Sequence, residues 1–110
     1  MSEIRIEQYA GGGLDNRGIM QMPQLPMLAQ AITLASSAAS AASATLNPKT
    51  RVLFIRATGG NVAFRTGDST GGDPTAVITD VALNDGETRY FALDPSAAVN
   101  GALKIAVIDR

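Results

Sequence analysis

The chain contains no cysteine, no histidine and no tryptophan, and aromatic residues make up only 5% of its 110 residues. Without cysteine there are no disulfides, no thiol catalysis and no cysteine-based metal sites. Without histidine the chain lacks the usual general base at neutral pH and the commonest metal ligand. We therefore expect a protein that is not an enzyme and has no cofactor and no metal site.

Charge of either sign is also scarce and evenly spread. The chain has nine basic and ten acidic residues, a net charge of −1 and no basic stripe. Nucleic acid is therefore not expected as a partner. The stretch from Gly18 to Pro48 has no charged residue and is long enough to cross a membrane, but Pro23, Pro26 and many Gln and Ser residues interrupt it. The start, "MSEIRIEQY", has no basic region before an apolar one. We expect neither a membrane span nor a secretory signal.

Residues 1–29 are interpreted as an extended N-terminal arm with a glycine-rich hinge. Strict alternation in "EIRIEQY", Glu3–Tyr9, predicts a short strand with one apolar face. Three glycines, Gly11–Gly13, follow, and then a segment that two prolines push toward extended backbone. A disordered terminus is the alternative, although disordered tails are usually poor in large apolar residues. The arm residues expected to contact a neighbouring protein are Ile4, Ile6, Met20, Met22, Leu25, Met27 and Leu28.

The remaining residues, 30–110, are predicted to form one β domain. In its first part, "AITLAS" and "ASATL" fit two short strands with small side chains, while the high alanine content leaves a helix open. From Arg51 the pattern is clearer: "RVLFIRAT" and "NVAFRT" across Gly59-Gly60 predict a hairpin, and "AVITDVAL", "TRYFAL" and "LKIAVID" predict further strands.

Short strands with turns at roughly ten-residue spacing are typical of an all-β fold. We expect a compact antiparallel β-sandwich or jelly-roll-like barrel with the N-terminal arm extending from it. The core is predicted to consist of Val52, Phe54, Ile55, Val62, Phe64, Phe91, Ile105 and Val107.

The polar loop Thr66–Thr75, "TGDSTGGDPT", carries Asp68 and Asp73 and is therefore a candidate site for cation or phosphate binding. The EF-hand pattern is absent, since Thr70 and Gly72 stand where acidic ligands are required. The glycines lack the strand–glycine–helix context and the lysine of a phosphate-binding loop. The Asp-Gly and Asp-Pro pairs are interpreted as turn residues in a flexible surface loop.

Four stretches together, "TRVLFIRAT", "NVAFRTGDSTGGDPTAV", "VALNDGETRYFAL" and "LKIAVID", resemble small β-rich virion proteins of tailed bacteriophages, several of which are capsid decoration or cement proteins. The shared features fall on Arg56–Thr58, Pro74-Thr75, Leu83–Phe91 and Lys104–Ile108. The resemblance covers residues 30–110 and does not include the arm. The loop before Pro74 is longer than the family's usual turn.

The resemblance implies a non-enzymatic virion structural protein on the capsid surface, made in the host cytoplasm. It implies a homo-oligomer, a trimer by analogy, whose other partner is the major capsid protein or another virion protein that the arm clamps by strand addition. Two alternatives stay open: a neck, tail or fibre-base component, and a receptor- or carbohydrate-binding module with its site in the Thr66–Thr75 loop.

Overall fold

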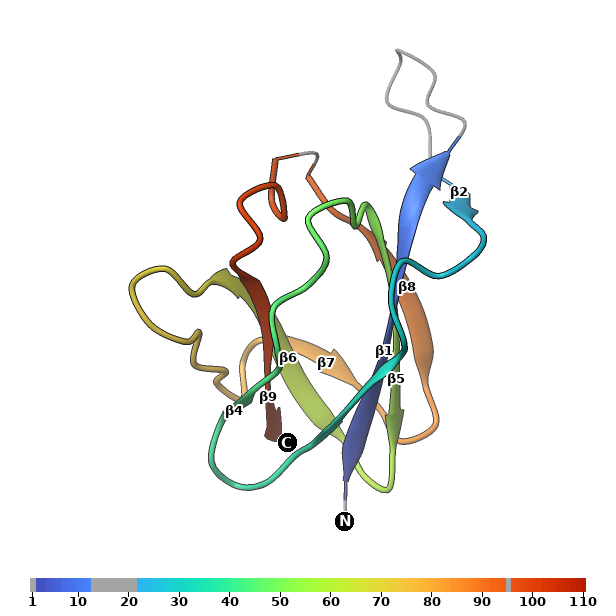
Figure 1. Cartoon of the computed structure of the whole chain (residues 1–110). Coiled ribbons are helices and arrows are strands. Elements are labelled where there is room, and N and C mark those ends of the chain that lie inside the picture. Colours follow the sequence, from blue (N-terminus) through green and yellow to red (C-terminus); the bar gives the residue numbers. More distant parts are fainter. Residues whose placement is uncertain (1, 13–21, 95) are drawn as a thin grey trace.

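The computed structural model describes residues 2–12, 22–94 and 96–110, and within them it contains strands and no helix. The strands are β1 (Glu3–Gly12), β2 (Met22–Gln24), β3 (Ile32–Ala35), β4 (Ala41–Ala42), β5 (Val52–Thr58), β6 (Val62–Asp68), β7 (Val81–Leu83), β8 (Thr88–Ala92) and β9 (Leu103–Asp109). They form two antiparallel sheets that face each other (Figure 1). The predicted all-β sandwich is therefore confirmed. No helix that could span a membrane occurs among the described residues.

The first sheet has β1 in its interior. Its order is β2-β1-β5-β8, and β3 also pairs with β1. β1 pairs with β5 from Glu3 to Tyr9, while its other edge is shared by β3, opposite residues 3–6, and β2, opposite residues 10–12. The predicted strand is present, but the prediction that residues 1–29 form an arm outside the β domain is wrong for this strand. Alternating isoleucines fit an interior strand of the chain's own sheet as well as a strand added to another protein.

The second sheet has the order β4-β9-β6-β7. β5 and β6, adjacent in sequence, therefore lie in different sheets, and the predicted hairpin between them is wrong. The chain passes from one sheet to the other at Gly59, whose φ of 86° favours glycine. It passes back between β7 and β8, and the two crossings brace each other: the Gly59 N–H donates to Asp85, and the Asp85 N–H donates to Asn61.

The core lies between the sheets and includes part of the predicted arm. Its buried residues are Ile4, Ile6, Leu46, Leu53, Ile55, Ala57, Val62, Phe64, Leu83, Ala98, Leu103, Ile105 and Val107. All residues of the predicted core are buried except Phe54 and Phe91. Phe91 is half-buried and packs against the observed core. Phe54 lies on the outer face of β5, because alternation turns Leu53 and Ile55 inward. Burial of one such aliphatic side chain contributes roughly 1.5–3 kcal/mol.

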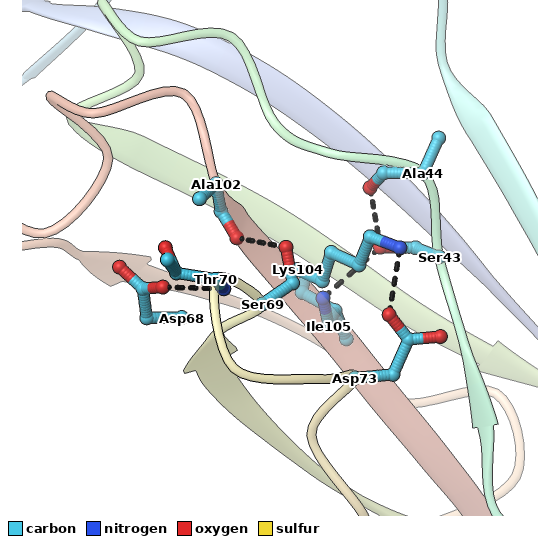
Figure 2. A network of polar contacts seen from close by, with 9 residues as sticks. All are labelled: Ser43, Ala44, Asp68, Ser69, Thr70, Asp73, Ala102, Lys104 and Ile105. Carbon is cyan, nitrogen blue, oxygen red and sulfur yellow. Dashed lines mark hydrogen bonds and ion pairs between the residues drawn. The ribbon is translucent and has the colours of Figure 1, made fainter.

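A third layer, the loop between β6 and β7, covers the outer face of the second sheet. Small residues make room for it: Ala63 and Ala106 are fully buried, and a Cβ on Gly67 would lie 2.7 Å from the Pro74 Cβ. Lys104 Nζ donates to Asp73 at 2.8 Å, and the Ser69 hydroxyl donates to the Ala102 carbonyl at 2.7 Å (Figure 2). The loop that the sequence suggested was flexible is thus tied to the sheet at several points.

Residues 30–48 form strands and no helix, as the sequence favoured, but these strands are short. β3 matches the first predicted strand, while β4 covers only Ala41–Ala42 and overlaps the predicted "ASATL" at its first residue alone. After β4 the chain is held by Ser43, whose hydroxyl accepts the Ile105 N–H at 3.0 Å. A run of alanines and serines can follow the edge of the sheet closely because its side chains are small.

Candidate interaction surface

A cleft of about 460 Å³ opens between the sheets on the side formed by β7 and β8. It exists because β7 has only three residues and pairs with Val62–Phe64, leaving the rest of β6 uncovered on this side. The cleft is lined by Leu53, Phe64, Arg65, Thr66, Asp80, Val81, Phe91, Ala92 and Leu93. Its volume lies within the roughly 300–1,000 Å³ typical of ligand pockets.

The interior of the cleft is apolar, and two aromatic rings pack together in it. The rings of Phe64 and Phe91 meet edge to face, with centroids 5.4 Å apart and an interplanar angle of 68°. This geometry is favourable for two aromatic rings. Leu53 and Leu93 complete the apolar lining. An apolar occupant would therefore be favoured over a charged one.

The charged groups at the rim of the cleft already pair with each other. Arg65 Nε and Nη2 each donate to Asp80 at 2.8 Å, and the Val77 N–H donates to the same carboxylate. The Arg65 hydrogen bonds, followed by the bond from Val77, lower the pKa of Asp80, and Asp80 in turn raises the pKa of Arg65. The pair fixes the turn that leads into β7 and leaves the rim without net charge.

Arg89 joins β8 to β7 at the other end of the β7–β8 side of the sandwich. Its guanidinium donates to the Ala82 carbonyl of β7, and it lies 5.5 Å from the centroid of the Phe91 ring. An inward-pointing charge on an edge strand is one way in which proteins discourage unwanted strand pairing. Arg89 and β7 thus form one boundary of the cleft.

β8 presents an open backbone edge beside the cleft. The Leu93 N–H bonds to the Arg51 carbonyl, and residues of an antiparallel strand alternate between bonding to a neighbour and facing away from it. Thr88, Tyr90 and Ala92 therefore direct their N–H and C=O groups away from β5. No strand among the described residues pairs with that edge.

Exposed apolar side chains also occur in the segment that leads into β7, in β7 itself and on the outer face of β8. Ile78 is 62% exposed and Tyr90 51% exposed, and Val77 and Val81 are also exposed. Sequence reasoning missed this group, because "AVITDVAL" was interpreted as a single strand when only Val81–Leu83 is one. The available signal was in "TRYFAL", where Tyr90 and Phe91 put large apolar groups on both faces of one strand.

The outer face of the first sheet carries a row of aromatic rings. The ring centroids of Phe54 and Tyr90 lie 4.7 Å apart, and those of Tyr9 and Phe54 lie 6.2 Å apart. The Tyr9 hydroxyl donates to Glu7 at 2.6 Å, and Arg5 Nε donates to the other oxygen of that carboxylate at 2.8 Å. These bonds, that of Tyr9 first, lower the pKa of Glu7, while Glu7 raises the pKa of Tyr9.

The residues predicted to contact a neighbouring protein do not form one surface. Ile4 and Ile6 are fully buried in the chain's own core, so their assignment as interface residues is wrong. Met20 lies outside the described residues, and only the backbone of Met22 is described, in β2. Leu28 is half-buried, while Leu25 and Met27 are 83% and 36% exposed and remain candidates.

Leu25 and Met27 are exposed because they lie in a bulge on the far edge of the first sheet. Between the pairs Ala10–Gln24 and Ile6–Ile32, β1 has three residues (7–9) and the opposing chain has seven (25–31). The four surplus residues cannot enter the ladder. The Leu28 N–H still bonds to the Gln8 carbonyl at 2.9 Å and thereby holds the bulge to β1.

The Thr66–Thr75 loop brings no cluster of free carboxylates together. The pKa of Asp68 is lowered first by the Thr70 side chain, then by the bond from the Thr70 N–H and then by the bond from Asn100. Asp73 accepts a hydrogen bond from the Lys104 ammonium (Figure 2). Among the described residues, no three acidic side chains lie close enough to hold a metal ion. The two aspartates therefore act in the structure as turn and anchor residues.

Comparison with known proteins yields no relative: no family model, no curated protein and no solved structure matches the chain.

Proposed function

We propose that this protein is a non-enzymatic structural component of a tailed-bacteriophage virion, of the capsid decoration or cement type. The proposal takes the class of protein from the sequence motifs at Arg56–Thr58, Pro74-Thr75, Leu83–Phe91 and Lys104–Ile108. In the structure these residues form the end of β5, the covering loop, the crossing from β7 to β8 with its strands, and β9. The partners under this proposal are further copies of the chain and the major capsid protein, on the virion surface.

The observation that carries the proposal is the β7–β8 side of the sandwich. Exposed apolar residues, an open strand edge and a neutral apolar cleft lie together there. Exposed apolar patches mark protein contacts, and an open edge offers backbone hydrogen bonds to another polypeptide. This surface replaces β1 as the attachment site that the sequence suggested.

The titration behaviour of the described carboxylates also supports a structural role. General acid catalysis at neutral pH requires a carboxyl group whose pKa is raised. The shifted carboxylates, Glu7, Asp68, Asp80 and Asp94, all have lowered pKa values, each because of hydrogen bonds that hold a turn or a strand face. Such bonds stabilise the ionised form and hold the local backbone in place.

The test is binding of the purified protein to phage shells prepared without it. Ile78→Asp introduces a charge into the exposed apolar group, and Val99→Asp is a matched control, since the two side chains are 62% and 57% exposed. We expect wild type and Val99→Asp to cosediment with the shells and Ile78→Asp to lose most of its binding. Equal binding by all three, or no binding by wild type, would contradict the proposal.

A carbohydrate- or receptor-binding module is a second candidate, favoured by the aromatic row. The sequence placed such a site in the Thr66–Thr75 loop, which contains no aromatic residue. In that row Phe54 and Tyr90, beside Arg5 and Glu7, offer the accessible rings and polar groups that the loop lacks. A glycan-array signal that is lost in Tyr90→Ala would support this candidate over the first.

A further inference from the structure

We infer that the protein self-associates head to tail, with the bulge of one copy, Leu25–Met27, inserted into the β7–β8 cleft of the next. This deepens the proposed function and rests on it for its biological role, by naming the partner of one part of the attachment surface. The two features lie on opposite edges of the first sheet: β2 and β3 flank the bulge, and β8 borders the cleft (Figure 1).

The bulge has the chemistry of an inserted group. Leu25 is 83% exposed and Met27 36% exposed, and Leu25–Gln30 contains no charge. Methionine adapts its shape to irregular apolar pockets. The bond from Leu28 to Gln8 holds the base of the bulge to β1, so part of the ordering cost of binding is already met by the fold.

The cleft has the matching chemistry. Its rim charges, Arg65 and Asp80, are satisfied by each other, so a charged peptide would gain no partner there. Its interior presents Phe64 and Phe91 to an apolar group, and its volume of about 460 Å³ suits a few side chains and no more. An uncharged apolar segment of limited length fits these conditions, and Leu25 is the most exposed large apolar side chain of the described residues.

The placement of the two features determines the symmetry of the assembly. A surface on one edge that meets a different surface on the opposite edge of the next copy makes a heterologous contact. Such contacts close into a ring or continue as a chain. The trimer implied by the sequence resemblance is one closed form of this arrangement.

The open edge of β8 adds a second source of affinity at the same place. The N–H and C=O groups of Tyr90 and Ala92 face outward next to the cleft. Backbone groups of a segment bound in the cleft can bond to them, apart from Pro26, which has no N–H. Side-chain insertion and backbone pairing would then act on one segment.

The absence of cysteine allows a direct test by cross-linking. Leu25→Cys protein is mixed with Val81→Cys protein under mild oxidation, because Val81 lines the cleft and is exposed. We expect a disulfide between the two different variants at twice the mass of the 11.4 kDa chain, identified by mass spectrometry of the digested product, because each variant can also oxidise with itself to the same mass. Val99→Cys mixed with Val81→Cys is the control and should give at least ten-fold less of it. Equal yields from the two mixtures would overturn the inference.

Light scattering with complementary variants tests the symmetry. Leu25→Asp disables the bulge, and Thr66→Arg fills the cleft from an exposed position on its wall. Each variant alone should be monomeric with an unchanged circular dichroism spectrum, and an equimolar mixture should form dimers and nothing larger. A mixture that stays monomeric, or single variants that keep the wild-type mass, would contradict a head-to-tail contact and indicate a two-fold interface such as β8 against β8.

Shell binding separates this inference from the proposed function. A wild-type protein that is monomeric at all concentrations, yet cosediments with shells, overturns head-to-tail association and leaves the decoration role standing. A protein that associates head to tail but does not bind shells overturns the decoration role and leaves head-to-tail association standing.

Discussion

The two apolar parts of the first thirty residues differ in where they lie. Ile4 and Ile6 are fully buried between β3 and β5, whereas Leu25 is 83% exposed in a bulge. Hydrophobicity does not separate them, but backbone geometry does. Alternation lets every second residue of β1 face the core, while Pro26 cannot donate to a ladder and restricts the residue before it. The apolar content of a terminal segment therefore says little about whether it serves the fold or a partner.

Deletion of residues 2–12 should test this difference with the largest effect. The deletion removes the strand between β3 and β5 and exposes Leu53 and Ile55 to water. We expect loss of the cooperative thermal transition in circular dichroism and collapse of amide dispersion in NMR spectra. Replacement of Leu25–Met27 by Gly-Ser-Gly should keep both signals. A truncated chain that still melts cooperatively would show that β1 is dispensable and would restore the arm interpretation.

Single truncations of side chains should show the same contrast on a smaller scale. Ile6→Ala removes a buried side chain from a packed core and should lower the free energy of unfolding by about 2–5 kcal/mol. Leu25→Ala removes an exposed one and should change it by less than about 0.5 kcal/mol. Urea denaturation of the two variants measures both values. Similar losses in the two variants would mean that the bulge is also part of the core.

The sequence predicted the strands well and their arrangement poorly. Glu3–Tyr9 and Leu103–Asp109 were found because apolar residues alternate with polar ones along each of them. Alternation cannot tell which strand lies beside which, and the turn at Gly59-Gly60 satisfies a hairpin and a crossing between sheets equally well. In both arrangements the same side chains, Ile55 and Phe64 among them, face one core.

The candidate surface was hidden from sequence reasoning for a related reason. The cleft depends on the shortness of β7, and β7 is short because Arg65 and Asp80 fix a turn just before it. That ion pair joins residues that are distant in sequence and has no local pattern. The bulge itself was not predicted, but Leu25 and Met27 were assigned to an extended arm, because an uncharged segment with prolines and large apolar residues has no obvious place in a small core.

Gln8 marks the junction between the buried strand and the exposed bulge, and its loss should have an intermediate effect. Its side chain is buried and accepts hydrogen bonds from the Asn47 N–H at 2.6 Å and from the Thr50 hydroxyl at 2.9 Å. Gln8→Ala leaves both donors without a protein partner and should cost about 1–3 kcal/mol. Gln30→Ala, at an exposed position, should be near neutral. Denaturant unfolding distinguishes them, and a neutral Gln8→Ala would show that water replaces the lost acceptor.

The outer face of β1 offers the smallest and most specific test, the titration of Glu7. Tyr9 and Arg5 both donate to this carboxylate, and the Tyr9 bond is the larger cause of its lowered pKa. In Tyr9→Phe the pKa of Glu7 should rise toward its ordinary value. In Arg5→Gln it should rise less. NMR titration of the Glu7 side-chain carboxyl measures both, and a larger rise in Arg5→Gln would show that the ion pair, not the phenol, controls the site.

The same titration has a consequence for stability with a definite sign. A carboxyl group whose pKa is lowered by folding stabilises the fold above its unfolded-state pKa, and this contribution is lost as pH falls through its folded-state pKa. The wild-type protein should therefore lose stability on acidification below about pH 4.3, the ordinary value for Glu, and part of that loss should be absent in Tyr9→Phe. Because the Glu7 side chain is 25% exposed, solvent screens the effect and the difference between the two curves should be small. Parallel stability curves for the two proteins down to the lowest pH measured would contradict this. They would mean that the pKa of Glu7 is lowered as much in the unfolded chain as in the folded one, and that the hydrogen bond from Tyr9 only orients the ring over Phe54.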